Sequence, residues 1–389
     1  MTKKWSSRLT FFAFVVLMVG LGSNDSLRGI FSTIFQEHFS LTTTQLGLIV
    51  TASYIGNLVF LLVGGNLSTR FSKKRVLQVL ILIWMAALAL FAFTSNYTVL
   101  LIGMALALGS STLLNTTMNL ITPLLFATAP GFFVNFLFFT QEIGTSGSQY
   151  ILGSHADGFA FWQHTNLVLL ILGAVAFVLL LFCNVPEEAA APADAPEQKG
   201  GYDWRIIVPY VLVFGFYFIA EHGVMNWMVA YGVDGLGLPQ ASAAKYLSVF
   251  FGGMMIGRLC LSPLVDKLGA LKSLAAVGGV SCVLYLIGSL GCAVTMPVLA
   301  ISGLSFSILY PTLVMSIRLY FPAQQVSGAA GTILSIASLA DILFNVGFGK
   351  LVDMTGYAVS IRVLPLSALA FFIVFMLFTK FCKPTQKLK

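Results

Sequence analysis

Two charged side chains, Asp25 and Arg28, interrupt the apolar stretch GLGSNDSLRGIF at residues 20–31. Their spacing of three residues places them on one face of a helix, close enough to pair. Inside a bilayer an ionised carboxylate costs about 2.5–3.5 kcal/mol, so it needs a partner, a wet cavity or a proton. Asp25 is therefore a candidate proton carrier or a hydrogen-bond acceptor for a solute, with Arg28 balancing its charge. A purely structural ion pair is the alternative.

A second acid, Glu142, lies beside Gln141 in the sequence FFTQEIGTSGSQ. Gly144 and Gly147 follow it and predict a close approach to a neighbouring helix. Gln141 and Glu142 then either line a cavity or form hydrogen bonds between two packed helices. We favour the cavity.

A third acid, Glu221, precedes His222 in the sequence FIAEHGVMNWM, with Asn226 and Trp227 shortly after. A carboxylate, an imidazole, an amide and an indole together offer a proton site, hydrogen bonds and a face for stacking. We predict that Glu221 couples transport to protons. His222 points to a different face of the helix.

Other polar side chains in apolar segments have two readings each. Asn115 and Asn119 are four residues apart, so they form an amide stripe that lines a cavity or bonds another helix. Asn24 directly precedes the first acid. Tyr310 lines the cavity or belongs to a helix break at the following proline. We expect the fourth acid, Asp341, to be a packing residue.

The composition is that of a membrane protein. Of 389 residues, 58% are hydrophobic and 9% are charged, whereas soluble domains carry about 25% charged residues. Apolar blocks recur at about the 20-residue length that a helix needs to cross a bilayer. The alternating ten-residue segments of a membrane barrel are absent from the sequence. We therefore predict an all-α membrane protein.

Twelve apolar segments predict two pseudo-symmetric bundles of six transmembrane helices. The stretch 184–204 is rich in Ala, Pro, Glu and Gly, which predicts a cytoplasmic linker between bundles at 1–183 and 205–389. The segments are 9–36, 44–66, 74–94, 98–122, 130–153, 165–183, 206–231, 242–264, 273–291, 294–320, 326–349 and 361–381.

Basic residues predict the orientation. With the N-terminus in the cytoplasm, 17 of the 21 Lys and Arg fall on that side, and both ends of the chain are inside. The net charge of +7 therefore reflects membrane topology rather than a nucleic-acid surface. The five cysteines are an odd number in apolar or membrane-edge positions, which argues against a disulfide framework.

The two halves repeat. GNLSTRFSKKRVL at 65–77 and SPLVDKLGALKSL at 262–274 begin 197 residues apart. Both have Leu at the third and last positions, a base at the sixth and another near the tenth. A duplicated six-helix unit is typical of transporters that bind their substrate near the middle of the membrane, between the repeats.

These two loops resemble the signature of the major facilitator superfamily, Gly-x-Leu-x-Asp-Arg-x-Gly-Arg/Lys-Arg/Lys-x-x-Leu. The first copy has Thr69 in place of the acid and Ser72 in place of the second glycine. It matches at Gly65, Leu67, Arg70, Lys73, Lys74 and Leu77, and the second copy at Leu264, Asp266, Lys267, Gly269, Lys272 and Leu274. The resemblance implies that these charges hold the cytoplasmic helix ends together in one access state. We assign gating roles to Gly65, Arg70, Lys73, Lys74, Arg258, Asp266 and Lys267.

Within that superfamily, the chain looks most like the fucose–galactose–glucose:proton symporters. The resemblance lies in SNDSLRGIFSTIFQEHFSLT with Asp25, IGRLCLSPLVDKLG with Arg258, SILYPTLVMSI with Tyr310, and the place of Trp227. Those symporters have a second essential carboxylate in their fourth helix, where this chain has Thr112. The family's helix-five amide corresponds to Gln141.

Together these features predict a secondary transporter for a small polar, sugar-like solute, working by alternating access and coupled to protons. Amides suit sugar hydroxyls, and aromatic rings suit the faces of sugars. The proton-coupling candidates are Asp25, Glu142 and Glu221. The substrate-binding candidates are Asn24, Arg28, Asn115, Gln141, His222, Asn226, Trp227 and Tyr310.

Other functions fit less well. A proton-coupled exporter of drugs or metabolites with the same fold is possible, and so is an organic-anion transporter, because Arg28 could hold a carboxylate. The sequence lacks a nucleotide-binding loop and a metal-ligand or catalytic motif, which argues against ATP as the energy source and against an enzyme. A sensor that binds without transport is a further alternative. We expect no cofactor, no metal and no nucleic acid, and a monomer in the cell membrane with a solute and the proton as partners.

Overall fold

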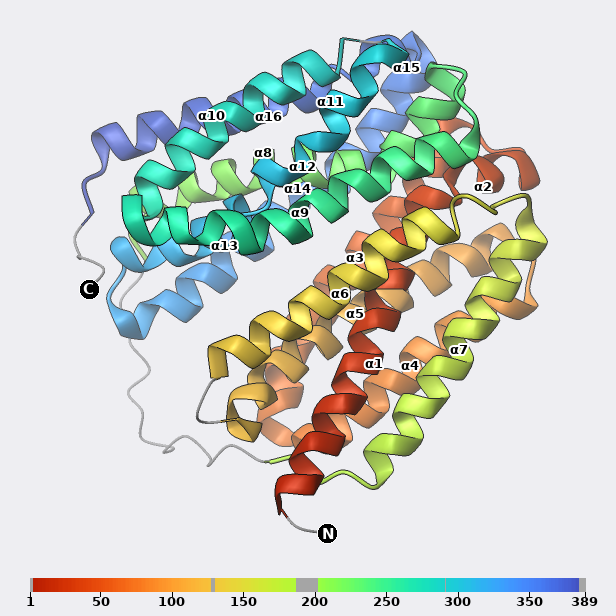
Figure 1. Ribbon diagram of the computed structural model, residues 1–389, viewed down its shortest axis with the longest axis vertical. Coiled ribbons are helices and arrows are strands. Elements are labelled where there is room, and N and C mark those ends of the chain that lie inside the picture. Colours follow the sequence, from red (N-terminus) through yellow and green to blue (C-terminus); the bar gives the residue numbers. More distant parts are fainter. Residues whose placement is uncertain (1–2, 127–129, 187–201, 291, 385–389) are drawn as a thin grey trace. The chain divides into compact units, whose positions relative to one another are not determined.

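The computed structural model describes residues 3–126, 130–186, 202–290 and 292–384. Within these ranges the regular elements are helices (Figure 1). Eleven described helical stretches are long and apolar enough to cross a membrane. The 22-residue helix α6 (Pro130–Ile151) occupies the remaining predicted segment. The residues fold into two units, Met1–Leu41 with Leu48–Lys199 and Thr42–Gly47 with Gly200–Lys389.

Unit 1 is built from seven helices, and the first turn of one of them belongs to unit 2. These helices are α1 (Lys3–Ile30), α2 (Ser32–His38), α3 (Thr43–Arg70), α4 (Lys73–Phe93), α5 (Tyr97–Leu125), α6 (Pro130–Ile151) and α7 (Phe159–Leu181).

Helix α1 is the central element of unit 1, where it packs against α6 and α7 (Figure 1). Glycines bring α1 and α6 into backbone contact. A Cβ at Gly22 would overlap the carbonyl oxygen of Gln141, and a Cβ at Gly144 would overlap that of Val19. Small residues allow helices to approach closely in a membrane, where apolar side chains gain little over lipid. Gly147 has nothing within 4 Å of such a Cβ, so the close approach predicted there is wrong.

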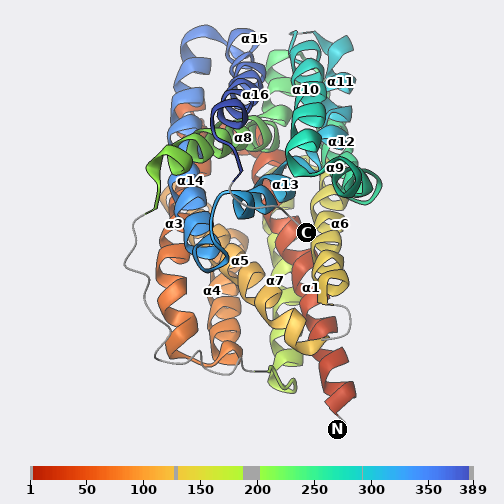
Figure 2. The same cartoon turned by 90° about the vertical axis from the view of Figure 1, so that its left-hand side faces the viewer.

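Unit 2 contains the remaining helices. They are α8 (Trp204–Ala230), the π-helical turn η1 (Tyr231–Gly235), α9 (Gln240–Leu268), α10 (Ala270–Gly288), η2 (Ala293–Thr295), α11 (Met296–Ile301), α12 (Gly303–Phe306), α13 (Leu309–Ser316), η3 (Ile317–Leu319), α14 (Ala323–Thr355), α15 (Tyr357–Ser360) and α16 (Val363–Phe381). Helix α8 packs against α14 and α16, and α9 packs against α11 and α12 (Figure 2).

Polar side chains cap the N-termini of several helices. The side chain of Ser72 accepts a hydrogen bond from the backbone at the start of α4, Asn96 does so for α5 and Asp203 for α8. Such N-caps satisfy backbone donors that have no partner within the helix. On α14, Asp353 accepts hydrogen bonds from the backbone nitrogens of Thr43 and Thr44, both at 2.8 Å, at the start of α3. The carboxylate thus complements the positive end of that helix.

Several predicted segment boundaries need correction. The sixth helix begins at Phe159 rather than at 165, and the first segment ends at Ile30, with α2 as a separate helix. The tenth segment, 294–320, is broken into short pieces. Pro297 and Pro311 lie in the first turns of α11 and α13, where a missing N–H is tolerated. Serine hydroxyls at the two breaks bond the backbone three residues earlier, which competes with helix continuation.

The predicted linker at 184–204 lies mostly outside the described residues, because 187–201 are not described. The bundle limits 1–183 and 205–389 stay predictions.

The repeat is visible in the packing within each unit. Gly56 on α3 and Gly253 on α9 are 197 residues apart, like the two loops. A Cβ at Gly56 would collide with the backbone of Ala105 on α5, and one at Gly253 would lie 3.0 Å from the backbone nitrogen of Leu304 on α12. The same small residue therefore permits an equivalent helix contact in both units.

The two loops differ at one equivalent position for a conformational reason. Gly269, between α9 and α10, has a φ of 79°, a left-handed conformation that favours glycine. Ser72, which is 197 residues earlier, has a φ of −58° and caps α4 with its side chain. The first loop therefore has no need of glycine at this position.

Candidate functional site

Asp25 lies on α1 inside unit 1, half-buried, and is bound from α5. The Ser111 hydroxyl donates to its carboxylate at 3.1 Å, and the Asn24 side-chain amide donates at 3.5 Å. Arg28, one turn further along α1, acts on the carboxylate electrostatically. Hydroxyl, amide and guanidinium groups all stabilise the ionised form of a carboxylate.

Arg28 is 5% exposed and lies over the ring of Tyr54 on α3, with its guanidinium carbon 5.7 Å from the ring centroid. This distance is within the range of a cation–π interaction. Its Nε atom is buried and has no hydrogen-bond partner among the described residues. The hydrogen bonds to the Asp25 carboxylate come from Ser111 and Asn24 rather than from Arg28.

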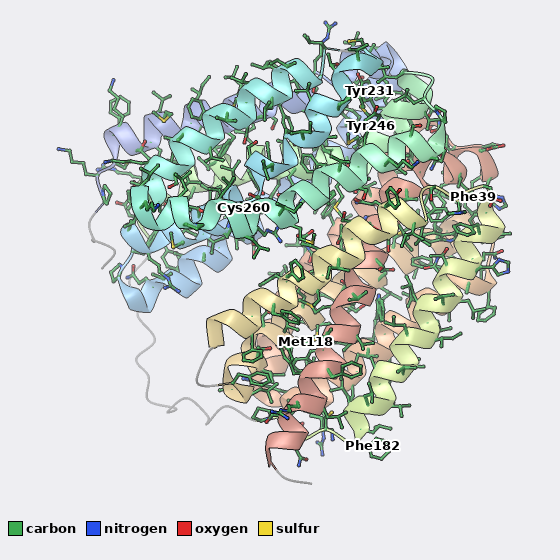
Figure 3. The ribbon with its side chains drawn as sticks, in the orientation of Figure 1. Phe39, Met118, Phe182, Tyr231, Tyr246 and Cys260 are labelled. Atoms are coloured by element: carbon green, nitrogen blue, oxygen red, sulfur yellow. The ribbon has the colours of Figure 1, made fainter. Side chains whose placement is uncertain are left out.

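A chain of amides joins α5 to α6. Asn119 donates its side-chain amide to the oxygen of Asn115 at 2.6 Å, and Asn115 donates to the oxygen of Gln141 at 2.7 Å. All three side chains are partly exposed. Met118, which Figure 3 labels on α5, is fully buried although it lies only three residues from Asn115, so the amide chain borders the apolar core of the unit. Of the two readings of the asparagine stripe, interhelical bonding is therefore present.

The polar groups of unit 1 follow α1 in order. The backbone carbonyl of Gln141 packs at Gly22, Ser111 binds Asp25, and Arg28 follows one turn on. Successive levels along α1 are about 4.5 Å apart, from a rise of 1.5 Å per residue. Three helices thus bring amides, a carboxylate and a guanidinium into one row. Glu142, the remaining acid of this unit, is half-buried on α6.

Unit 2 has its own cluster around Glu221 on α8. The Glu221 carboxylate lies within electrostatic reach of Tyr217, Tyr285 and Tyr310. The charge of Arg258, on α9, acts on Tyr217 and Tyr310 as well. One acid, three phenols and one base therefore share a site. The predicted gating residue Arg258 thus lies in this cluster.

The other predicted residues of α8 differ in their surroundings. The His222 ring stacks on Phe218 at a centroid distance of 5.2 Å. Trp227 is fully buried, and its indole nitrogen donates to Asn345 on α14 at 2.8 Å. Asn226 is also buried. Trp227 thus joins two helices within unit 2.

Tyr310, on α13, stacks on Tyr217 with 6.2 Å between the ring centroids and is 36% exposed. The ring of Tyr310 is thus partly accessible and belongs to the Glu221 cluster.

Among the predicted gating residues, Lys74 has the clearest contacts. Its ammonium group donates to the backbone oxygens of Leu181 at 3.0 Å and Cys183 at 2.7 Å, at the end of α7. A lysine there satisfies carbonyls that lack a partner within the helix and complements the helix dipole. Lys73 is buried and Lys267 is exposed. The surroundings of Gly65 and the side chains of Arg70, Asp266 and Asp341 lie outside the described part of the structure.

The structure adds residues that sequence reasoning missed. Ser111 holds Asp25, Tyr54 lies under Arg28, and Tyr217 and Tyr285 lie close to Glu221. Only Tyr217 had a signal in the sequence, because it precedes Glu221 by four residues and so shares its helical face. The others come from different helices.

The chain matches the family model of the Major Facilitator Superfamily over residues 10–343, and it therefore belongs to that superfamily. It is 28% identical over 341 residues to a glucose/galactose transporter of Brucella abortus, covering 82% of this chain and 81% of the relative. It is 24% identical over 321 residues to a cis,cis-muconate transport protein of Acinetobacter baylyi, covering 77% of this chain and 73% of the relative. It is 23% identical over 332 residues to the L-fucose-proton symporter of Escherichia coli, covering 74% and 75%.

Solved structures agree on the fold. A D-xylose-proton symporter superposes with a TM-score of 0.77 at 15% identity, covering 99% of both chains. The fucose:proton symporter of Escherichia coli superposes with a TM-score of 0.64 at 19% identity, covering 97% of this chain and 99% of that one. The predicted all-α membrane fold of the superfamily is confirmed. The protein is a multi-pass membrane protein and a secondary transporter of small solutes rather than an enzyme.

Proposed function

We propose that this protein is a proton-coupled symporter of a small polyhydroxylated, sugar-like solute. The observation that carries the proposal is the half-buried Asp25 carboxylate, held by Ser111 within a row of polar groups inside a membrane-spanning unit. An acid in that setting is suited to exchange a proton during transport. Sugar and fucose–proton transport by two of the relatives supports the same reading.

The solute contacts follow from the polar groups in each unit. In unit 1, Asn24, Asn115 and Gln141 offer amides to hydroxyl groups. In unit 2, Tyr310 offers a partly exposed ring and His222 an imidazole for contact with the solute. Asn226 and Trp227 are buried, so we assign them to shaping the site behind these two side chains. The duplicated fold works by alternating access, in which the repeats rock about a site near mid-membrane.

One acid in each half is a leading proton-carrier candidate. Asp25 and Glu221 are 196 residues apart, one residue short of the 197-residue spacing of the loops, so the position that corresponds to Asp25 is His222, directly beside Glu221. Both lie on the first helix of their half, and both have hydroxyl-bearing neighbours. Glu142 is the third candidate.

We assign gating to the loop residues Gly65, Arg70, Lys73, Lys74, Asp266 and Lys267, supported by the contacts of Lys74 with the end of α7. Arg258 is the seventh gating candidate, and its charge also acts on Tyr217 and Tyr310 in the Glu221 cluster. Both termini are cytoplasmic in this proposal, which rests on the distribution of the 21 bases. We propose a monomer in the cell membrane.

Counterflow in proteoliposomes tests the proposal. Purified protein is reconstituted with unlabelled solute inside and labelled solute outside, across a panel of hexoses, deoxyhexoses and sugar acids. We expect exchange of at least one sugar-like solute and, with an inward proton gradient, its accumulation. Exchange of lipophilic cations alone would instead favour an exporter.

A further inference from the structure

We infer that Arg28 is an anion-binding residue and that the transported solute carries a carboxylate. The solute would be a hydroxylated carboxylic acid of the sugar-acid class. This inference rests on the proposed function, because it names the substrate class of the same site.

The first observation is the state of the guanidinium itself. Arg28 is 5% exposed, and its Nε has no hydrogen-bond partner in the described part of the chain. A buried charged donor without an acceptor is costly and rare in a native protein. Tyr54 covers one face of the guanidinium plane, but a ring face accepts none of its in-plane N–H bonds. The edge of the guanidinium is suited to the two oxygens of a carboxylate, which it can bind in a bidentate manner.

The second observation is how the nearby acid is held. Asp25 takes its hydrogen bonds from Ser111 and Asn24, so it balances the charge of Arg28 through space without occupying its donors. When Asp25 accepts a proton, Arg28 loses that balancing charge, and a solute carboxylate can replace it. Proton and anion then bind together, because each favours the other. No covalent bond changes except O–H formation on Asp25.

No other charge among the described residues acts on Asp25 with comparable effect, since Arg28 supplies the electrostatic contribution to its environment. Among the described titratable groups on the helices around α1, only Tyr54 on α3, under Arg28, is buried. The others are half-buried or exposed: Glu37 and His38 on α2, Tyr97 on α5, Glu142 and Tyr150 on α6, and His155 and His164 at or near α7.

The third observation is the length of the polar row. From Arg28, the Asp25–Ser111 level and then the Gln141–Asn115 level follow at about 4.5 Å each along α1. A hydroxy acid with its carboxylate at Arg28 can extend its hydroxyls past Asp25 toward the amides. A neutral hexose can offer hydroxyl oxygens to the guanidinium but no negative charge, and hydrogen bonds between ionised groups are the stronger ones.

The experiment compares solutes in wild-type proteoliposomes. The probes are D-gluconate, D-glucuronate, D-glucose, L-fucose and cis,cis-muconate, each in counterflow at pH 6 and pH 8, where the acids are anions. We expect gluconate or glucuronate to exchange at least about tenfold better than either hexose, because a hydrogen bond from the guanidinium to a carboxylate is roughly twice as strong as one to a neutral hydroxyl group. The apparent affinity for the acid should rise from pH 8 to pH 6 in the wild type and stay constant in Asp25→Asn.

Variants of Arg28 test the same inference through the apparent affinity for the acid. Arg28→Gln should lower the apparent affinity for the acid by about 10- to 100-fold, and Arg28→Lys should recover part of it because the charge returns without the planar fork. Arg318→Gln, which removes an exposed arginine of unit 2, is the matched control and should leave affinity unchanged. Thermal unfolding of each variant in detergent separates loss of binding from loss of folding.

Each outcome decides between the proposals. Exchange of hexoses with no exchange of sugar acids, together with an active Arg28→Gln, overturns the anion inference and leaves sugar symport standing. Exchange of muconate without any hydroxylated solute keeps Arg28 as an anion site and overturns the sugar-like function. Failure of all five probes overturns both.

Discussion

The hydroxyl of Ser111 on α5 donates a hydrogen bond to the carboxylate of Asp25 on α1 over 3.1 Å. This bond ties the leading proton-carrier candidate to a second helix of the same unit. Because α5 also holds Asn115, which binds Gln141 on α6, one helix organises both the acid and the amides.

Replacing Asp25 should abolish proton-driven accumulation of the solute without abolishing its exchange across the membrane. Asp25→Asn keeps the size of the side chain and can still accept the Ser111 hydrogen bond through its carbonyl oxygen, but it cannot take up a proton. We expect proton-driven accumulation to disappear while counterflow persists. Ser111→Thr, which keeps the hydroxyl, is the control and should accumulate solute. Wild-type accumulation by Asp25→Asn would remove Asp25 from the coupling role.

Glu221 should behave as a second coupling acid in unit 2. Glu221→Gln removes the charge that acts on three tyrosines. We expect proton-driven uptake to fall at least about tenfold, because glutamine cannot take up and release a proton. Tyr217→Phe removes only a hydroxyl beside that acid and should have a smaller effect. Initial rates of labelled uptake with and without a proton gradient measure both. Equal rates in Glu221→Gln and the wild type would assign this acid a purely structural role.

Lys74 should keep the end of α7 from fraying, and the reactivity of the Cys183 thiol toward maleimide should measure this. Cys183 is fully buried, and burial raises the pKa of its thiol, so less reactive thiolate is present at neutral pH. Cys260, labelled on α9 in Figure 3, and Cys292 are exposed. Maleimide should therefore modify these two first and Cys183 last, as mass spectrometry of digested protein can measure.

The variant Lys74→Met removes the donor to the carbonyls of Leu181 and Cys183. The end of α7 should then fray, and labelling of Cys183 should rise several-fold while that of Cys260 stays the same. Unchanged labelling of Cys183 would show that Lys74 does not hold this helix end.

The close contact between α1 and α6 should tolerate no added methyl group at Gly144. Gly144→Ala places a Cβ against the carbonyl of Val19, and overpacking of this kind costs about 1–3 kcal/mol. Gly147→Ala, on the same helix with nothing within 4 Å, should be neutral or stabilising by about 0.5–1 kcal/mol. Thermal unfolding in detergent compares the two variants. A Gly144→Ala protein as stable as Gly147→Ala would contradict the contact.

The sequence by itself determined the class of fold and the candidates for chemistry. Hydropathy is a property of each segment alone, so the twelve segments, the duplication and the acids at 25, 142 and 221 could be found without coordinates. Helix breaks were harder, because whether Pro297 and Pro311 lie inside a helix or in its first turn depends on the hydrogen bonds of neighbouring serines.

Only the tertiary structure decided which of those side chains meet. Ser111 donates a hydrogen bond to Asp25, and Trp227 donates one to Asn345. Arg258 acts electrostatically on Tyr217 in the Glu221 cluster. Such pairings depend on the rotation of each helix about its axis and on the packing of helices far apart in the chain. An apolar helix in lipid carries little polar pattern to fix that rotation, so glycine contacts and interhelical hydrogen bonds fix it instead.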